Sequence, residues 1–341
     1  MDLIIITGQT ATGKTNLAFE YAAKYNGEIV NFDSRQIYKY LDIITGKDLP
    51  IKSKIKNQRS KPSFKIKNRI NNFDIGYYKL PTTDNLSSEV LPKIRHPRTS
   101  EVKLWLYDVV FPDQYFSSYD FTQCANLVVE DIVKRGKTPI LVGGTYFYLK
   151  HFLYGFNVSP VPANPGLREK LNNKSVVKLQ DTLKRIDLKS FESMNNSDKN
   201  NPRRLIRKIE IATSNQQPVT TIHEPRTYFF QSAISNQQLA IKQFIGLKYK
   251  RKENLVAAIK QRVEKRLKQG ALDEVRSLLK KGYKASDPGL TTIGYQELIQ
   301  YLEGKLTEDK AIETWVNHEV QYAKRQLTFM KKDENIHWNI I

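Results

Sequence analysis

The feature that most constrains this chain is a glycine loop close to its first residue. The loop matches the pattern G-x-x-x-x-G-K-(S/T) and consists of Gly8, Gln9, Thr10, Ala11, Thr12, Gly13, Lys14 and Thr15. An apolar run at residues 3–6 precedes it, and apolar residues at helical spacing follow it. The order of buried strand, glycine loop and helix predicts a phosphate-binding loop in a parallel α/β sheet.

The residue types in the loop indicate how it would hold a phosphate. Its backbone N–H groups and the N-terminus of the following helix both favour negative charge. Lys14 adds a mobile cation, and the Thr15 hydroxyl can ligate Mg²⁺. We therefore expect a pyrophosphate or triphosphate site with Mg²⁺ as its cofactor. The loop alone does not say which phosphate compound it binds, or whether that compound is hydrolysed.

The composition indicates in which cellular compartment the protein works and what kind of partner it binds. No apolar run approaches the roughly 20 residues of a membrane span, and the chain opens on a core strand rather than a cleavable signal. The single cysteine, Cys124, excludes an internal disulfide and a cysteine-based zinc site. We expect a cytoplasmic monomer without a membrane segment. The net charge of +20 favours a nucleic-acid partner, and a merely basic soluble protein is the alternative.

A polar block follows the second predicted strand, Glu28–Phe32. It consists of Asp33, Ser34, Arg35 and Gln36. Parallel α/β sheets place their ligands at the carboxyl ends of strands, so this block would face the phosphate loop. The Ser, Arg and Gln side chains carry hydrogen-bonding groups that suit the edge of a nucleobase. A lone Asp in such a place is more often a helix cap, which is the structural alternative for Asp33.

Four further blocks complete a pattern over nearly the whole chain. Residues 108–121 resemble D-x-x-x-P-D-x-x-(Y/F)-S-x-x-D-F, and residues 139–149 resemble P-I-L-V-G-G-T-x-x-Y. Residues 202–210 are similar to Q-R-x-x-R-A-L-E, while 293–297 and 322–328 are similar to I-G-Y and A-K-R-Q-x-T-W. In this order, and with the glycine loop and the polar block, they resemble the tRNA dimethylallyltransferases, a family also called isopentenyltransferases.

The chain departs from the family pattern at several positions. Phe329 stands where Trp is usual, and Val320 stands where Arg is usual, which removes one expected cation. Residues 41–48 are a shuffled version of M-D-I-G-T-A-K-P. Residues 49–102 form a basic segment longer than the family norm, which we interpret either as an RNA-contacting arm or as a solvated loop or small hairpin. Deletion of roughly residues 52–98 is expected to leave the core folded.

The pattern of elements predicts one architecture. Strands that alternate with helices indicate a P-loop NTPase-like α/β core with a parallel sheet, made of residues 1–156 and 227–341. Between them, residues 157–226 carry helical patterns and predict an α-helical insertion domain, which the resemblance assigns to tRNA contact. The expected core elements include the strand Leu104–Val109 and the helices Ala271–Lys280 and Tyr295–Leu302.

The resemblance implies an enzyme that transfers a dimethylallyl group from dimethylallyl diphosphate to the N6 amine of adenosine at tRNA position 37, beside the anticodon. It implies that Asp33 is the general base, while Thr15 with Mg²⁺ and Arg266 stabilise the diphosphate in the glycine loop. Catalytic roles therefore fall to Asp33, Thr15 and Arg266. The residues expected to contact tRNA are Asp33, Ser34, Arg35, Gln36, Thr145, Arg168, Arg203, Arg204 and Arg207.

Two other classes of protein remain open on the sequence. An adenylate isopentenyltransferase would use the same core on a free nucleotide, but it needs no large RNA surface, so the charge and the helical insertion argue against it. A P-loop kinase or NTP-driven RNA-binding protein would bind ATP and need a carboxylate after a hydrophobic strand, for which Asp108 is a weak candidate. An ATP-hydrolysis assay with and without RNA separates this last class.

Overall fold

The chain divides into two compact units. One unit consists of Met1–Gly155 with Tyr228–Ile341, and the other of Phe156–Thr227. Each has a hydrophobic core of its own. In this computed structural model the described residues are 2–47, 64–70, 72–81, 101–155, 161, 164–214 and 239–341.

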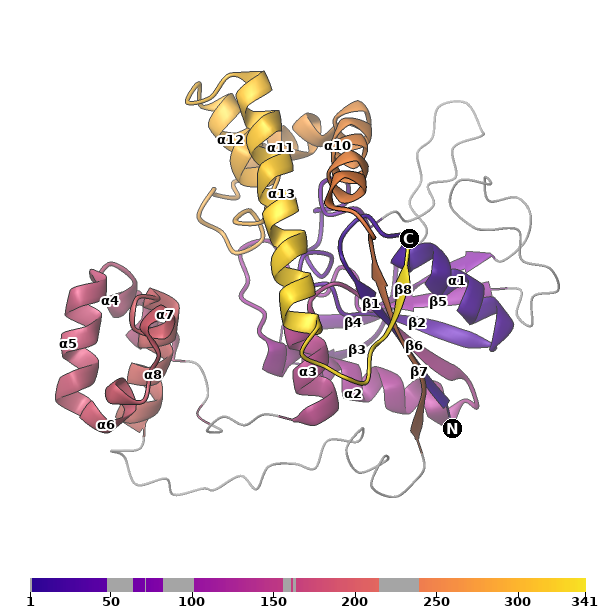
Figure 1. Cartoon of the computed structure of the whole chain (residues 1–341), viewed down its shortest axis with the longest axis horizontal. Coiled ribbons are helices and arrows are strands. Elements are labelled where there is room, and N and C mark those ends of the chain that lie inside the picture. The colour runs from indigo at the N-terminus through magenta and orange to yellow at the C-terminus, as the bar shows by residue number, and fades with distance from the viewer. Residues whose placement is uncertain are drawn as a thin grey trace. The chain divides into compact units, whose positions relative to one another are not determined.

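The first unit is built on a single sheet (Figure 1). Within the described residues the strands follow the order β3-β4-β5-β2-β6-β1-β7-β8, and every pair from β5 to β8 is parallel. The strands are β1 (Asp2–Gly8), β2 (Gly27–Asn31), β3 (Phe64–Ile70), β4 (Phe73–Pro81), β5 (Glu101–Trp105), β6 (Thr138–Val142), β7 (Ala240–Lys248) and β8 (His337–Ile340). The expected α/β fold with a mostly parallel sheet is confirmed.

Strand β1 lies in the interior of the parallel part of the sheet, between β6 and β7. Its residues Leu3, Ile4, Ile5 and Ile6 are fully buried, as expected for a parallel strand covered on both faces. Leu3 and Ile5 pack into one hydrophobic cluster, while Ile4 and Ile6 pack into another. Successive side chains of a strand point to opposite faces, so this one apolar run anchors both layers of the unit.

Helices cover both faces of the sheet (Figure 1). Ala18, Phe19 and Ala22 of the first helix share the cluster of Ile4 and Ile6, whereas Phe121 and Val128 of the helix Ser118–Lys134 share the cluster of Leu3 and Ile5. The helices of this unit, among its described residues, are α1 (Lys14–Lys24), α2 (Ser118–Lys134), α3 (Tyr146–Tyr154), α10 (Lys252–Lys268), α11 (Ala271–Lys280), α12 (Tyr295–Leu302) and α13 (Glu308–Met330). None of the described helices is both long and apolar enough to cross a membrane.

The basic segment contributes two strands to the same sheet. β4 pairs antiparallel with β5, and its residues Ile75, Tyr78 and Leu80 are buried in the core. β3 pairs with β4 at the edge of the sheet and is largely exposed. The expectation that residues 52–98 can be deleted without unfolding the core is therefore wrong, because the deletion removes a strand with a buried face. The segment's remaining cations, in residues 48–63 and 82–100, lie outside the described residues, and its RNA role stays a prediction.

The second unit is made of short helices around a small core. Its helices, in the described part, are α4 (Pro165–Asn172), α5 (Val176–Ile186), α6 (Leu188–Glu192), α7 (Asn196–Lys199) and α8 (Pro202–Ser214). Helices α4, α5 and α7 all pack against α8. The buried residues at its centre are Leu171, Leu179, Leu183, Met194, Leu205, Ile206, Ile209 and Ala212. The insertion therefore buries its apolar residues within itself.

Candidate active site

The glycine loop lies between β1 and α1, at the carboxyl end of the central strand. Gly8 has a φ of 137°, and a Cβ there would lie 2.2 Å from the carbonyl oxygen of Leu247, so only glycine fits. Thr12 Oγ1 donates a hydrogen bond to the carbonyl oxygen of Gln9 at 2.8 Å, and Lys14 Nζ donates to the same oxygen at 2.5 Å. The ammonium group of Lys14 therefore lies against the backbone of the loop, where a phosphate would meet it.

The pKa of Lys14 is lowered to about 8. Burial is the main cause, and the charge of Arg262 adds to it, while the Asp33 carboxylate acts in the opposite direction. The lysine is therefore charged at neutral pH and loses its charge at mildly alkaline pH. An anion bound in the loop would favour the protonated form.

We expect the affinity for inorganic pyrophosphate to fall as the pH rises through about 8, because Lys14 loses its charge there. Calorimetric titration across this pH range measures the effect. A Lys14→Met variant should bind more weakly throughout and should lack this decline, which separates Lys14 from the titration of pyrophosphate itself. Parallel pH profiles for the two proteins would contradict the assignment.

A metal ion at the loop would depend on few protein ligands. Thr15 follows Lys14 in the first turn of α1 and is half-buried. Within the part of the chain that the structure describes, no group of three or more His, Cys, Asp or Glu side chains could hold a metal ion. Mg²⁺ suits such a place, since it keeps several waters and commonly binds the phosphate oxygens of a substrate.

Two side chains from distant segments support the loop. The Tyr249 hydroxyl donates to the carbonyl oxygen of Ala11 at 2.6 Å. Gln326 of α13 accepts a hydrogen bond from the Thr10 N–H at 3.1 Å through Oε1, and it donates through Nε2 to the Gly144 carbonyl oxygen at 2.9 Å. Gln326 thereby joins the phosphate loop to the glycine turn after β6. Sequence reasoning treated Gln326 only as part of a C-terminal block, because nothing local marks this contact.

Asp33 lies just beyond β2, beside the turn that follows β6. Its Oδ1 accepts a hydrogen bond from the Arg35 N–H at 3.0 Å. Its Oδ2 lies 3.5 Å from the position that a Cβ on Gly144 would take, while Gln326 Nε2 lies only 2.3 Å from that position, so both side chains meet at this glycine. Asp33 is also close enough to Lys14 for its charge to act on the pKa of that lysine. The structure thus brings the carboxylate and the phosphate loop into one site.

Thr145 holds the same segment from the start of α3. The Ser34 N–H donates to Thr145 Oγ1 at 2.9 Å, and that hydroxyl donates to Ser34 Oγ at 3.0 Å. The structure therefore brings together Asp33, Ser34 and Thr145, three of the residues expected to contact tRNA.

The side chains of Arg35 and Gln36, which were also expected to contact tRNA, point into the protein. Arg35 Nη1 lies 2.9 Å from Glu319 Oε1, and its guanidinium carbon is 3.8 Å from the centre of the Tyr322 ring. Although burial alone would lower it, the pKa of Arg35 is raised by the Glu319 carboxylate. Gln36 Nε2 donates to the Gly46 carbonyl oxygen at 2.6 Å. Both side chains are engaged within the protein, and contact of either one with a base stays a prediction.

Arg262 and Arg266 lie one turn apart on α10, and both reach the loop at residues 44–45, where Arg262 donates to the Thr45 carbonyl oxygen at 3.4 Å. Arg262 Nη1 donates to Oγ1 of Thr10, within the phosphate loop. Arg266 is 4% exposed and donates to the backbone carbonyl of Ile44. The structure therefore places Arg262, rather than the expected Arg266, against the phosphate loop. Their spacing of four residues puts both on one helix face, so the sequence alone could not separate them.

Glu319 of α13 is buried among these cations. It is 3% exposed, and it lies near Arg35, Arg262 and Arg266. Burial would raise the pKa of Glu319, but the three guanidinium groups lower it, so the carboxylate stays ionised at neutral pH. One anion thus offsets part of a cationic cluster, and the excess positive charge remains beside the phosphate loop.

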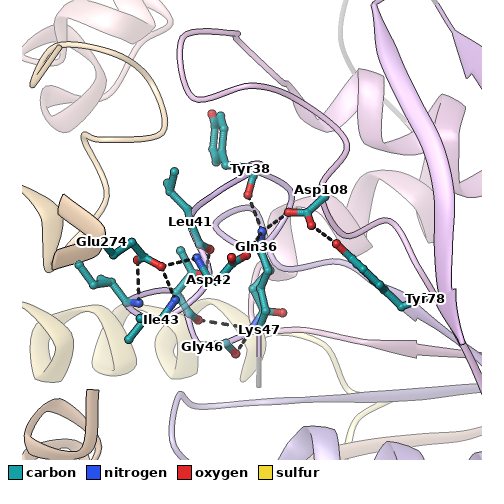
Figure 2. Close-up of polar contacts among 12 residues, drawn as sticks. Gln36, Tyr38, Leu41, Asp42, Ile43, Gly46, Lys47, Tyr78, Asp108 and Glu274 are labelled. Atoms are coloured by element: carbon teal, nitrogen blue, oxygen red, sulfur yellow. Dashed lines mark hydrogen bonds and ion pairs between the residues drawn. The ribbon is translucent and has the colours of Figure 1, made fainter. Parts of the chain in front are cut away.

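The loop at residues 41–47, whose Ile44 carbonyl binds Arg266, is fixed in turn by α11 and by a buried cluster around Lys47 (Figure 2). Glu274 of α11 accepts hydrogen bonds from the backbone N–H groups of Asp42, Ile43 and Ile44 at 2.9, 2.7 and 3.2 Å. A single carboxylate therefore binds three consecutive peptide groups, which fixes the position of the Ile44 carbonyl.

Lys47 fixes the other end of this loop and is 2% exposed (Figure 2). Its ammonium group donates to the Tyr38 carbonyl oxygen at 2.6 Å and to Asp42 Oδ1 at 3.0 Å. It also pairs with Asp108, which accepts a hydrogen bond from the Tyr78 hydroxyl. Asp108, the weak candidate for the carboxylate of an NTP-hydrolysing site, is therefore engaged in this buried cluster.

We expect Lys47→Met to lower the free energy of unfolding by about 3–5 kcal/mol, because it leaves two carboxylates without their buried cation. Urea denaturation measures the change. Lys280→Met, on the exposed face of α11, is the matched control and should change stability by less than about 0.5 kcal/mol. Equal effects for the two variants would show that the cluster is not a structural support.

The second unit gathers two of its expected tRNA contacts around one carboxylate. Glu210 is 2% exposed and binds Arg168 through both oxygens, at 2.6 and 2.8 Å, and Arg207 at 3.1 Å. Burial would raise the pKa of Glu210, but the hydrogen bonds from Arg168 and Arg207 lower it. Arg203 and Arg204 are exposed in the first turn of α8. Arg204 pairs with Asp198, so the structure uses Arg168, Arg204 and Arg207 within the unit and leaves Arg203 exposed.

The phosphate loop follows β1, and the Asp33 carboxylate follows β2, which is separated from β1 by β6. This arrangement in a parallel sheet defines a P-loop enzyme. Comparison with known proteins is more specific. The family model described as IPP transferase matches residues 92–333. The chain is 31% identical to a tRNA dimethylallyltransferase of Acetivibrio thermocellus, over 99% of this chain and 91% of the relative. It is also 31% identical to one of Anoxybacillus flavithermus, over 98% of this chain and 89% of the relative.

A solved structure agrees with these relatives. The full-length tRNA isopentenylpyrophosphate transferase from Bacillus halodurans is 28% identical, with a TM-score of 0.59, and the match covers 99% of this chain and 89% of that one. The chain therefore belongs to the IPP transferase family, and the resemblance seen in its sequence blocks is confirmed.

Proposed function

We propose that this protein transfers a dimethylallyl group from dimethylallyl diphosphate to the N6 amine of adenosine at position 37 of tRNA, beside the anticodon. The observation that supports this most is the meeting of the Asp33 carboxylate and the phosphate loop in one site. The loop suits a diphosphate leaving group, and the carboxylate suits an acceptor that must lose a proton. The family membership of the chain points to the same reaction.

The phosphate loop stabilises the leaving group. Backbone N–H groups and Lys14 meet the negative charge that grows on the diphosphate as its bond to the allylic carbon breaks. We assign the guanidinium clamp to Arg262, because it reaches Thr10 of the loop. Thr15 would hold Mg²⁺ together with oxygens of the diphosphate, where the ion supplies further neutralising charge.

Asp33 acts on the acceptor. The adenosine amine is a weak nucleophile, because its lone pair is delocalised into the ring. Asp33 accepts a hydrogen bond from this amine and takes its proton as the bond from nitrogen to carbon forms. The allylic carbon needs no enzyme nucleophile, since its cationic character is shared over the allyl group. The target base must leave its stack in the anticodon loop to reach this carboxylate.

The other two classes are less well supported. An adenylate isopentenyltransferase has no use for a net charge of +20, and the curated relatives are named as tRNA enzymes. A P-loop kinase would need a free carboxylate after its strand, whereas Asp108 pairs with Lys47. We also propose that the protein acts as a monomer, and in the cytoplasm, where tRNA is used.

The test is mass spectrometry of nucleosides from tRNA that has been incubated with the protein, Mg²⁺ and dimethylallyl diphosphate. We expect N6-isopentenyladenosine, formed without stoichiometric consumption of ATP. Omission of dimethylallyl diphosphate is the control, and AMP replaces tRNA in a parallel reaction. Product on AMP but not on tRNA would favour the free-nucleotide enzyme, and neither product would refute the proposal.

A further inference from the structure

A second hollow lies outside the residues of the proposed site. It is a pocket of about 310 Å³ between α3 and the segment that follows α13. The residues that matter to its chemistry are Tyr146, Lys150, Tyr154, Phe329, Lys332 and Asn335. Within the described residues it combines aromatic rings, two cations, an amide and the carboxylates of Asp333 and Glu334, and the rings and cations are groups that bind nucleotides.

The floor of this pocket is a fixed network around Asp333. This buried carboxylate accepts hydrogen bonds from the hydroxyls of Tyr146 and Tyr154, the second at 2.8 Å, and from the Asn335 N–H at 3.0 Å. Burial and the hydrogen bond to Asp333 raise the pKa of Tyr154 to about 12, so its hydroxyl remains a donor. The network ties α3 to the segment after α13 and keeps the rings in place.

Aromatic rings form one side of the pocket and continue beyond it. Phe329 meets the edge of Tyr146 with ring centres 5.3 Å apart, and Phe147 lies 6.4 Å from Phe329. Tyr154 is 47% exposed and Phe147 is 48% exposed. Exposed aromatic rings are surfaces on which proteins stack unpaired bases.

Two cations stand at the rim. Lys150 and Lys332 are exposed, and neither forms an ion pair with the described residues. Lys150 Nζ lies 5.8 Å from the centre of the Phe329 ring. Glu334 also lines the pocket and supplies an acceptor that suits the amino group of a base. Cations beside stacking surfaces are typical of sites for single-stranded nucleic acid.

Two helices connect this pocket to the proposed site. Thr145, which holds Ser34, caps α3, and Lys150 lies on the same helix about 8 Å further along its axis. Gln326, which holds the Thr10 N–H, precedes Phe329 on α13 by about 5 Å along the axis. The pocket is therefore within reach of a nucleotide adjacent to one that occupies the site.

We propose that this pocket binds a nucleotide of the tRNA that flanks the target adenosine, with its base against Phe329 and Tyr154 and its phosphates on Lys150 and Lys332. The inference rests on the proposed function, since it takes tRNA as the substrate. It assigns the pocket to an unpaired part of the RNA, because a base that is paired and stacked in a helix has no free face to lay on an aromatic ring.

The first test removes both cations. We expect the Lys150→Ala/Lys332→Ala double variant to raise the KM for an anticodon stem-loop roughly tenfold with kcat within about twofold, because the contacts bind substrate and transition state alike. The slope of log affinity against log salt should fall by about 1.4–1.8, the value for two lost phosphate contacts. Lys260→Ala/Lys280→Ala removes two exposed cations elsewhere and is the control. A KM and a salt slope equal to those of the control pair would overturn the proposal.

The second test addresses stacking. Phe329→Leu should weaken binding of the stem-loop by about fivefold or more, the lower limit for one stacked base. We would repeat it with RNAs that carry an abasic nucleotide at single positions beside the target. At the position whose base enters the pocket, the losses of binding free energy caused by the abasic change and by Phe329→Leu should not be additive. Full additivity at every position would overturn the proposal.

Two further measurements distinguish a failure of the pocket assignment from a failure of the proposed function. If wild-type protein binds the stem-loop without forming isopentenyladenosine, the proposed function fails while the affinity measurements still decide the pocket. If the lysine variant loses affinity for AMP but keeps the wild-type KM for the stem-loop, the pocket is a free-nucleotide site, and the assignment to tRNA is overturned. Melting curves of all variants confirm that they are folded.

Discussion

Asp33→Asn is expected to slow transfer to tRNA by about 10²–10⁴-fold, the range for loss of a general base, while the affinity for tRNA changes little. Asparagine preserves the size of the side chain and an oxygen for the Arg35 N–H, which Asp33 Oδ1 binds at 3.0 Å. It cannot accept a proton. The substitution therefore retains the turn and removes only the chemistry.

Single-turnover transfer with saturating dimethylallyl diphosphate measures this effect, and a filter-binding assay measures tRNA affinity. Asp309→Asn, in the exposed first turn of α13, is the control and should leave both unchanged. If Asp33 only caps a turn, the Asn variant will react at nearly the wild-type rate. That outcome would remove Asp33 from the mechanism.

Arg262→Ala is expected to lower kcat/KM for dimethylallyl diphosphate by about 10²–10³-fold, the usual cost of one donor to a developing anion. Its guanidinium contacts Thr10 of the phosphate loop. Arg266 is the matched comparison, since it lies one turn away on the same helix but binds the Ile44 carbonyl. Arg266→Ala should lower the melting temperature and change the rate of the folded enzyme much less.

The two arginine variants should be compared at temperatures where both are folded. Steady-state kinetics gives the rates, and thermal denaturation gives the folded fraction. A folded Arg266→Ala enzyme that is slower than Arg262→Ala would return the clamp to Arg266 and make the contact with Thr10 incidental.

The elements that sequence reasoning predicted well are those with local signals. The phosphate loop could be predicted because its signal is local. An apolar run, two glycines and a helical pattern follow one another within a short stretch of sequence. The helices Ala271–Lys280 and Tyr295–Leu302 have the expected bounds as α11 and α12. The strand expected at Leu104–Val109 instead ends at Trp105, because the next residues include left-handed turns at Leu106 and Asp108.

What the sequence could not show depends on distances between remote segments. The four-residue spacing on α10 cannot say which arginine meets the phosphate loop. Gln326 contacts Thr10 across most of the chain, so no local pattern indicates it. The strand β4 could not be predicted within the basic segment, because charged residues surround it in the sequence. Its buried face forms only when β4 pairs with β5. Charge density alone is therefore a poor guide to whether a segment belongs to the core.

The central position of β1 has a consequence for biosynthesis. Residues 2–8 pair with β6 on one side and with residues 240–247 of β7 on the other, and the Gln9 N–H binds the Leu247 carbonyl at 3.1 Å. Among the described strands of this sheet, β1 is the first to be translated, and it is enclosed only after β7 has followed. Its apolar edge stays unpaired while most of the polypeptide is translated, which makes it a natural ligand for nascent-chain chaperones. The phosphate loop can take its final conformation only after β7 has been translated, so the active site forms late in translation.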